Sequence, residues 1–252
     1  GICSVARSMP TSRAIDYVAE KKGIKVFESF FPSPKLFFSS LLVWVVGVVA
    51  LWYSFGVQLG ELLGFQFTPA DAPPVIGLGY FITPEFIWFD IYYILATLAF
   101  YGFWNYYEPH KWQLWSVLGS SLLILMAYMT VQVSVVINAW YGPFYNDIQK
   151  ALGGEEGITA GDLYGHILIF CVIVFPYIVF VPVKLFFTSH YVFRWRNAMN
   201  DHYVSQWSNV RQIEGASQRI QEDTMRFSGI MQGLGVSMID SVMTLISFLP
   251  VL

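Results

Sequence analysis

The segment at residues 189–229 reads SHYVFRWRNAMNDHYVSQWSNVRQIEGASQRIQEDTMRFSG and is the longest polar stretch in an otherwise apolar chain. Apolar residues recur in it every three or four positions, at Val192, Trp195, Met199, Tyr203, Trp207, Val210 and Ile213. This spacing is typical of a helix with one buried stripe. It predicts a membrane helix that continues into water, breaks at Gly215, and is followed by a second helix, capped by Ser217, that leads back to the membrane.

The composition identifies the broad class of protein. Of the 252 residues, 56% are hydrophobic and 12% are charged, whereas soluble domains contain about 25% charged residues. The chain is therefore predicted to be an all-α integral membrane protein. Cys3 and Cys171 are too few and too far apart for a disulfide framework or a zinc site.

Hydropathy divides the chain into segments long enough to cross a bilayer, which takes about 20 apolar residues. Residues 1–26 are polar and are expected to be an extension outside the transmembrane domain, which covers 27–252. A helical extension is predicted at 189–227. The chain stops inside an apolar run, which predicts a further span after Leu252. Spans are expected at about 36–57, 86–107, 114–140, 163–187 and 228–252.

The basic residues predict the orientation, because Lys and Arg gather on the cytoplasmic side of membrane proteins. Of the 14 Lys and Arg residues, 13 precede the first span, lie between the second and third, or belong to the segment after the fourth, which is taken to include Lys184. The opposite loops hold Lys150 alone and an excess of acids. The N-terminus and the segment 189–229 are thus expected in the cytoplasm.

Motifs of soluble enzymes are missing from the sequence, which contains no phosphate loop, GxSxG, HExxH or CxxC. We therefore expect no enzyme activity, no cofactor, no metal site and no nucleic-acid partner. Inserting an acid into the middle of a membrane span costs roughly 2.5–3.5 kcal/mol. The presence of Asp90 and Asp240 inside predicted spans therefore has to be explained. Each is either a proton or substrate site facing a cavity or an interfacial acid that reaches water.

Two further clusters are candidates for function. In the cytoplasmic segment, helical spacing places acids beside arginines, which indicates either a solvated ion-pair face or a docking and gating element. In the outer loop, the sequence NAWYGPFYND predicts an aromatic anchor at the membrane surface that also lines an outer gate. The proton-coupling candidates are Glu214, Glu222 and Asp240. The coupling or gating candidates are Arg194, Arg196, Arg219, Asp223 and Arg226. The gate or substrate-lining candidates are Trp140, Tyr141, Phe144, Tyr145 and Gln132.

Several long stretches resemble the SbmA/BacA inner-membrane peptide transporters of Gram-negative bacteria. They are SFFPSPKLFF (29–38), YEPHKWQLWSVLGSSL (107–122), VINAWYGPFYNDIQKAL (136–152), SHYVFRWRNAMNDHY (189–203) and IEGASQRIQEDTMRF (213–227). The last two are the most specific, since they are ungapped and rich in Trp, Arg and Met. The resemblance covers about 27–252, roughly the N-terminal half of such a protein.

The resemblance implies a homodimer whose helical bundle is similar to the transmembrane domain of an ABC exporter without nucleotide-binding domains. It also implies proton-driven import of antimicrobial peptides and peptide-like antibiotics. The region of Glu214, Arg219, Glu222 and Asp223 resembles the coupling turn of ABCD-type transporters. Relatives often have Glu where this chain has Gln232, a departure that puts the proton route in question and makes Glu214 and Glu222 the better candidates.

The sequence thus predicts a dimeric importer in the bacterial inner membrane that works by alternating access. Two alternatives stay open. One is the transmembrane subunit of an ATP-driven transporter with its nucleotide-binding domain past Leu252. The other is a membrane factor in envelope lipid metabolism that transports nothing.

Overall fold

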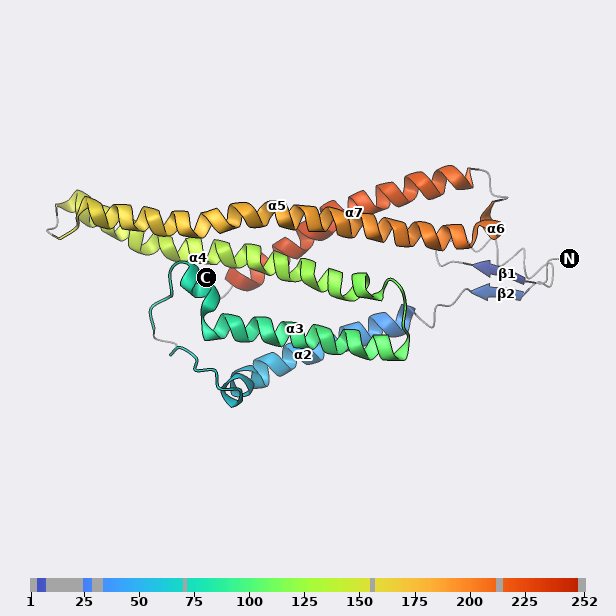
Figure 1. Cartoon of the computed structure of the whole chain (residues 1–252), viewed down its shortest axis with the longest axis horizontal. Helices are drawn as coiled ribbons and strands as arrows, with labels where there is room; N and C mark the ends of the chain where they lie inside the picture. Colours follow the sequence, from blue (N-terminus) through green and yellow to red (C-terminus); the bar gives the residue numbers. More distant parts are fainter. Residues whose placement is uncertain are drawn as a thin grey trace. The chain divides into compact units, whose positions relative to one another are not determined.

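The computed structural model of the chain describes residues 4–7, 25–28, 34–69, 72–154, 157–211 and 215–248, and most of these are helical (Figure 1). They fall into two compact units, residues 1–56 with 199–223, and residues 57–198 with 224–252. In chain order the elements are β1 (Ser4–Arg7), β2 (Lys25–Glu28), α2 (Pro34–Leu62), η1 (Leu78–Ile82), α3 (Pro84–Tyr107), η2 (Leu114–Gly119), α4 (Ser120–Gly153), α5 (Ala160–Ser205), α6 (Trp207–Val210) and α7 (Ala216–Phe248).

Four helical segments in the described part of the chain are long and apolar enough to cross a membrane. They are Leu36–Leu62 in α2, α3, the continuous segment Leu114–Gly153 formed by η2 and α4, and α5. The predicted class of all-α polytopic membrane protein is confirmed. The fifth predicted span, 228–252, begins inside α7 and extends beyond the described residues, and it stays a prediction.

The N-terminal extension contains two short strands that the sequence did not predict. β1 and β2 pair in parallel, with Ser4 opposite Lys25 and Arg7 opposite Glu28. A pair of four-residue strands is marginal by itself in water, and the fold is otherwise helical.

The prediction for the polar segment was right in kind and wrong in its boundaries. α5 continues as one helix of 46 residues through Pro176 and Pro182, about 69 Å at 1.5 Å per residue, so it is longer than a bilayer is thick. It ends at Ser205, before the predicted break. Gly215 has φ of 74°, a left-handed conformation that suits glycine, and α7 begins directly after it. Ser217 therefore lies inside α7 and does not cap it.

The helices of the second unit pack antiparallel, which the pairs of contacting residues establish. Between α3 and α4, the contacts run from Tyr80 with Gln132, just before α3, to Tyr93 with Ser121. Between α4 and α5 they run from Trp140 with His166 to Ser120 with Tyr191. Between α5 and α7 they run from Lys184 with Asp240 to Trp195 with Phe227. In each case one number rises as the other falls.

The end of α2 packs closely on the start of α3. The Phe65 and Trp88 ring centroids are 5.6 Å apart, and Trp88 is buried. Gly60 allows this approach, because a Cβ at that position would lie 3.1 Å from Trp88 Cδ1 and still closer to the Phe67 ring. Glycine at 60 is thus required by packing.

Candidate functional site

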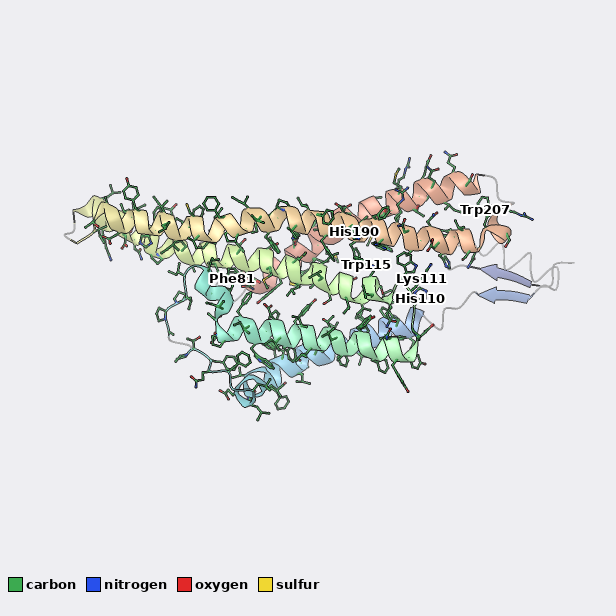
Figure 2. All side chains as sticks on the ribbon, viewed as in Figure 1. Phe81, His110, Lys111, Trp115, His190 and Trp207 are labelled. Atoms are coloured by element: carbon green, nitrogen blue, oxygen red, sulfur yellow. The ribbon has the colours of Figure 1, made fainter. Side chains whose placement is uncertain are left out.

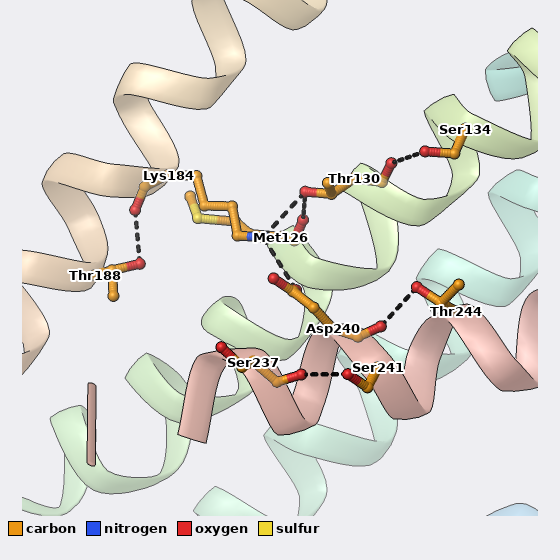
Figure 3. Close-up of polar contacts among 9 residues, drawn as sticks. All are labelled: Met126, Thr130, Ser134, Lys184, Thr188, Ser237, Asp240, Ser241 and Thr244. Carbon is orange, nitrogen blue, oxygen red and sulfur yellow. Dashed lines mark hydrogen bonds and ion pairs between the residues drawn. The ribbon is translucent and has the colours of Figure 1, made fainter. Parts of the chain in front are cut away.

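A lysine and an aspartate meet between helices of the second unit (Figure 3). The Nζ of Lys184, in α5, lies 3.2 Å from Oδ1 of Asp240 in α7 and donates to it. The same Nζ donates to Oγ1 of Thr130 in α4 at 3.2 Å. The Lys184 side chain is 14% exposed and that of Asp240 is 40% exposed. One ammonium group therefore connects three helices.

The hydroxyl groups around this pair bind mainly to their own helices. Thr130 donates to the carbonyl of Met126, Thr188 to that of Lys184, and Thr244 to that of Asp240. Serine and threonine commonly make such bonds to the carbonyl one turn earlier. Because the Thr130 proton is donated within α4, the Thr130 hydroxyl can only accept from Lys184, and the carboxylate of Asp240 supplies the opposite charge.

The two charges of the pair depend on each other. A charge inside a membrane segment is costly, and two opposite charges reduce each other's cost when they are in contact. Without the Asp240 charge, the Lys184 ammonium would keep the Thr130 hydroxyl as its other described partner. The charge of Asp240 therefore strengthens the contact between α5 and α7.

Sequence reasoning identified Asp240 and missed Lys184 as its partner. The prediction that Lys184 belongs with the basic residues after the fourth span is wrong, because its side chain is largely buried against α4 and α7. The signal was present in the sequence, since Lys184 lies within the predicted span 163–187. A basic residue in one span and an acid in another predict a pair.

The aromatic residues predicted for the outer gate form a packed cluster around Trp140. Trp140 is buried, its Nε1 donates to the carbonyl of His166 at 2.9 Å, and its ring stacks on Phe144 with centroids 4.5 Å apart. The Phe170 ring lies 4.9 Å from it. Trp140 and Phe144 thus join α4 to α5.

The other two aromatic candidates are more exposed. Tyr141 and Tyr145 stack on each other with centroids 5.7 Å apart, and both are about half exposed. On the same part of α4, Asp147 contacts Nε2 of His166 at 2.9 Å. The arrangement places a polar bridge beside the Trp140 cluster, whereas a gating role for these residues stays a prediction.

Gln132, the remaining candidate for lining a substrate path, is buried and already bonded. The Tyr80 hydroxyl of η1 donates to Gln132 Oε1 at 2.7 Å. Burial raises the pKa of Tyr80 above its ordinary value, so this phenol keeps its proton and remains a donor. Gln132 therefore anchors η1 to α4.

Among the coupling candidates, Arg194 contacts the ring side chains of Trp115 and His190. Its guanidinium lies 5.1 Å from the Trp115 ring centroid, a cation–π contact. Its Nε donates to His190 Nε2 at 3.3 Å. Trp115 and His190 lie together at the contact of η2 with α5, with ring centroids 5.2 Å apart (Figure 2). Arg196 is half-buried on the same helix.

For the acidic candidates of the segment 189–229, the described contact lies within one helix. Gln218 Nε2 donates to Glu222 Oε1 at 3.0 Å within α7, and Asp223 and Arg226 are exposed. Glu214 and the side chain of Arg219 lie outside the described part of the chain. Of the three proton-coupling candidates, Asp240 is the one for which a contact with a neighbouring helix is described.

The sequence profile of the SbmA/BacA-like family matches residues 109–252. The match covers more than half of the chain and begins just after α3. It contains the Lys184–Asp240 pair, the Trp140 cluster and the Arg194 surroundings.

Proposed function

The chain belongs to the SbmA/BacA-like family, a family of membrane transporters, and we propose on this premise that it imports peptides through the bacterial inner membrane, driven by the proton gradient. Its substrates are antimicrobial peptides and peptide-like antibiotics. It acts as a homodimer by alternating access, with its N-terminus in the cytoplasm. Family membership supports transport, and the distribution of Lys and Arg supports the orientation.

The Lys184–Asp240 pair is the observation that supports proton coupling. Alternating access needs an interface between helices with two arrangements whose balance a bound ion can change. The α5–α7 contact contains a carboxylate whose protonation removes the attraction to Lys184. In the proposed cycle, Asp240 takes a proton on the outer side, α5 and α7 part, and the proton leaves on the cytoplasmic side as the pair forms again.

Peptide uptake by cells that express the intact protein tests this proposal. A fluorescent cationic peptide is supplied with and without a protonophore, while the ATP level is held constant. We expect uptake to stop when the gradient is removed. Uptake that survives the protonophore and fails on ATP depletion would instead support an ATP-driven transporter. If expression made no difference to uptake, a non-transporting membrane factor would be the better account.

The role of the pair is tested by Asp240→Asn, which keeps the shape of the side chain and removes its charge. We expect gradient-driven uptake to fall at least 10-fold. Lys150→Met is the matched control, because Lys150 is half exposed and lies 3.8 Å from Asp147 in a surface pair, which contributes little. Equal uptake by both variants would refute the assignment of Asp240.

A further inference from the structure

A second acid inside the membrane helices, Asp90 of α3, lies apart from the Lys184–Asp240 pair. Its Oδ1 is buried, and among the described residues it has no hydrogen-bond partner. A buried carboxylate oxygen without a hydrogen-bond partner is costly inside a membrane segment, and a neutral carboxyl group costs far less. Asp90 is the seventh residue of α3, about 9 Å along the axis from its first residue, so it lies inside the span.

The face of α3 that carries Asp90 is lined by polar groups on both sides of it. Tyr93 and Thr97 follow Asp90 at the spacing of one helix face. The Tyr93 hydroxyl is bonded to Ser121 of α4, donating to its carbonyl at 2.9 Å and accepting from its Oγ at 2.8 Å. Thr97 Oγ1 lies 2.9 Å from the same Oγ. Just before the start of α3, the Tyr80–Gln132 bond joins η1 to α4.

Tyr128 of α4 faces Asp90 across this contact. Its ring lies 4.6 Å from Phe89 and 6.0 Å from Phe86, centroid to centroid, so it packs on the part of α3 that holds Asp90. The Tyr128 phenol interacts electrostatically with both Asp90 and Tyr80. The Tyr128 phenol is thus the hydroxyl of α4 that interacts with the Asp90 carboxyl group.

In the described part of the chain, the ionisable group that interacts with Asp90 from a packed element is Tyr128 of α4, and Tyr80 of η1 interacts with Tyr128 in turn. Neither phenol carries a positive charge. The segment η2, which also contacts α3, has the sequence LWSVLG and holds no ionisable residue. The end of α2 contributes Glu61, which is exposed. Among the described residues, Asp90 therefore has no cationic partner of the kind that Lys184 provides for Asp240.

We propose that Asp90 is a second proton-binding site of this transporter, located in a polar seam between α3 and α4 that Tyr80, Tyr93, Tyr128 and Ser121 line. The proposal rests on the proton-driven function proposed above. Asp90 binds a proton as a neutral carboxyl group when the seam is closed, as it is in this structure. It releases the proton when α3 and α4 move apart and water reaches Oδ1.

Asp90 of α3 and Asp240 of α7 lie beside neighbouring residues of α4. Tyr128 faces Asp90, and Thr130, two residues later, contacts Lys184 of the other pair. Two residues advance a helix by about 3 Å and turn it by roughly 200°. α4 therefore separates the two sites and contacts both, so a rotation or tilt of α4 changes them together.

The test uses the intact protein reconstituted in vesicles, with Asp90→Asn as the variant that mimics the neutral carboxyl group. We expect peptide accumulation driven by an imposed pH gradient to fall at least 10-fold. Exchange of labelled for unlabelled peptide at equal pH on both sides should stay within about threefold of wild type, because exchange needs no net proton movement. Asp201→Asn, an exposed acid of α5, is the control and should accumulate peptide as wild type does.

Infrared difference spectra of the same proteins measure protonation without transport. On raising the pH, wild type should lose a band of a protonated carboxyl group, and this band should be absent from Asp90→Asn and shifted in Asp90→Glu. Unchanged accumulation by Asp90→Asn, or an unchanged carboxyl band in either variant, would overturn the proposal. If wild-type accumulation ignored the gradient while the band behaved as expected, the proton-driven function would fail and Asp90 would remain a protonation site.

Discussion

Replacing Asp240 and replacing Lys184 are expected to lower the free energy of unfolding by different amounts, although each change breaks the same pair. Asp240→Asn leaves the Lys184 ammonium, only 14% exposed, with the Thr130 hydroxyl as its other described partner. Lys184→Met leaves a carboxylate that is 40% exposed and can be hydrated. Asp240→Asn leaves the more buried charge without its partner, so it should be the less stable of the two variants.

The magnitudes follow from the burial of each group. Stranding a fully buried charge costs about 3–5 kcal/mol. Since Lys184 is not fully buried and keeps one contact, we expect Asp240→Asn to lower the free energy of unfolding by about 2–3 kcal/mol. Lys184→Met should lower it by about 1 kcal/mol, since hydration offsets most of the loss. The double variant should be more stable than Asp240→Asn alone, because neither charge remains.

Unfolding in mixed micelles with increasing denaturing detergent gives the four free energies of this double-mutant cycle. The coupling energy should exceed the cost of Lys184→Met and reach about 1.5 kcal/mol, near the upper end of the range of polar contacts measured between membrane helices. Lys150→Met serves as the control and should change stability by less than about 0.5 kcal/mol. Costs of the two single variants that simply add, or a greater cost for Lys184→Met, would refute the reasoning.

Three other contacts give predictions for the same unfolding assay. Tyr80→Phe removes the donor to buried Gln132 and should cost about 1–3 kcal/mol. Because burial raises the pKa of Tyr80 from 10.0, its contribution is complete below pH 10 and is lost as the pH rises through the folded-state pKa, so stability should fall more steeply there in wild type than in Tyr80→Phe. Trp140→Phe should cost about 1 kcal/mol through the lost bond to the His166 carbonyl, and a value near zero would show that this bond contributes nothing. Gly60→Ala should cost about 1–3 kcal/mol by overpacking, and unchanged or increased stability would contradict the packing argument.

Composition and periodicity were sufficient for the class of protein and for its main helices. Long apolar runs must form helices in a bilayer, because their backbone groups have no water to bind. The predicted spans at 36–57, 86–107, 114–140 and 163–187 lie inside α2, α3, α4 with η2, and α5. The helix boundaries near Ser205 and Gly215 were less accurate, since the polar periodicity continues past the point where the helix ends.

The tertiary structure alone decided which polar residues meet. The sequence indicated that Asp90 and Asp240 are unusual acids inside membrane spans, but it gave the same two interpretations for both. Packing gives Asp240 a lysine from another helix, whereas Asp90 interacts with the Tyr128 phenol and its Oδ1 has no hydrogen-bond partner among the described residues. The physical reason is that spacing along one helix determines a face, whereas a partner on another helix depends on how two helices are rotated and aligned. That alignment follows from contacts such as Trp140 with His166 and Tyr93 with Ser121, which are far apart in the chain.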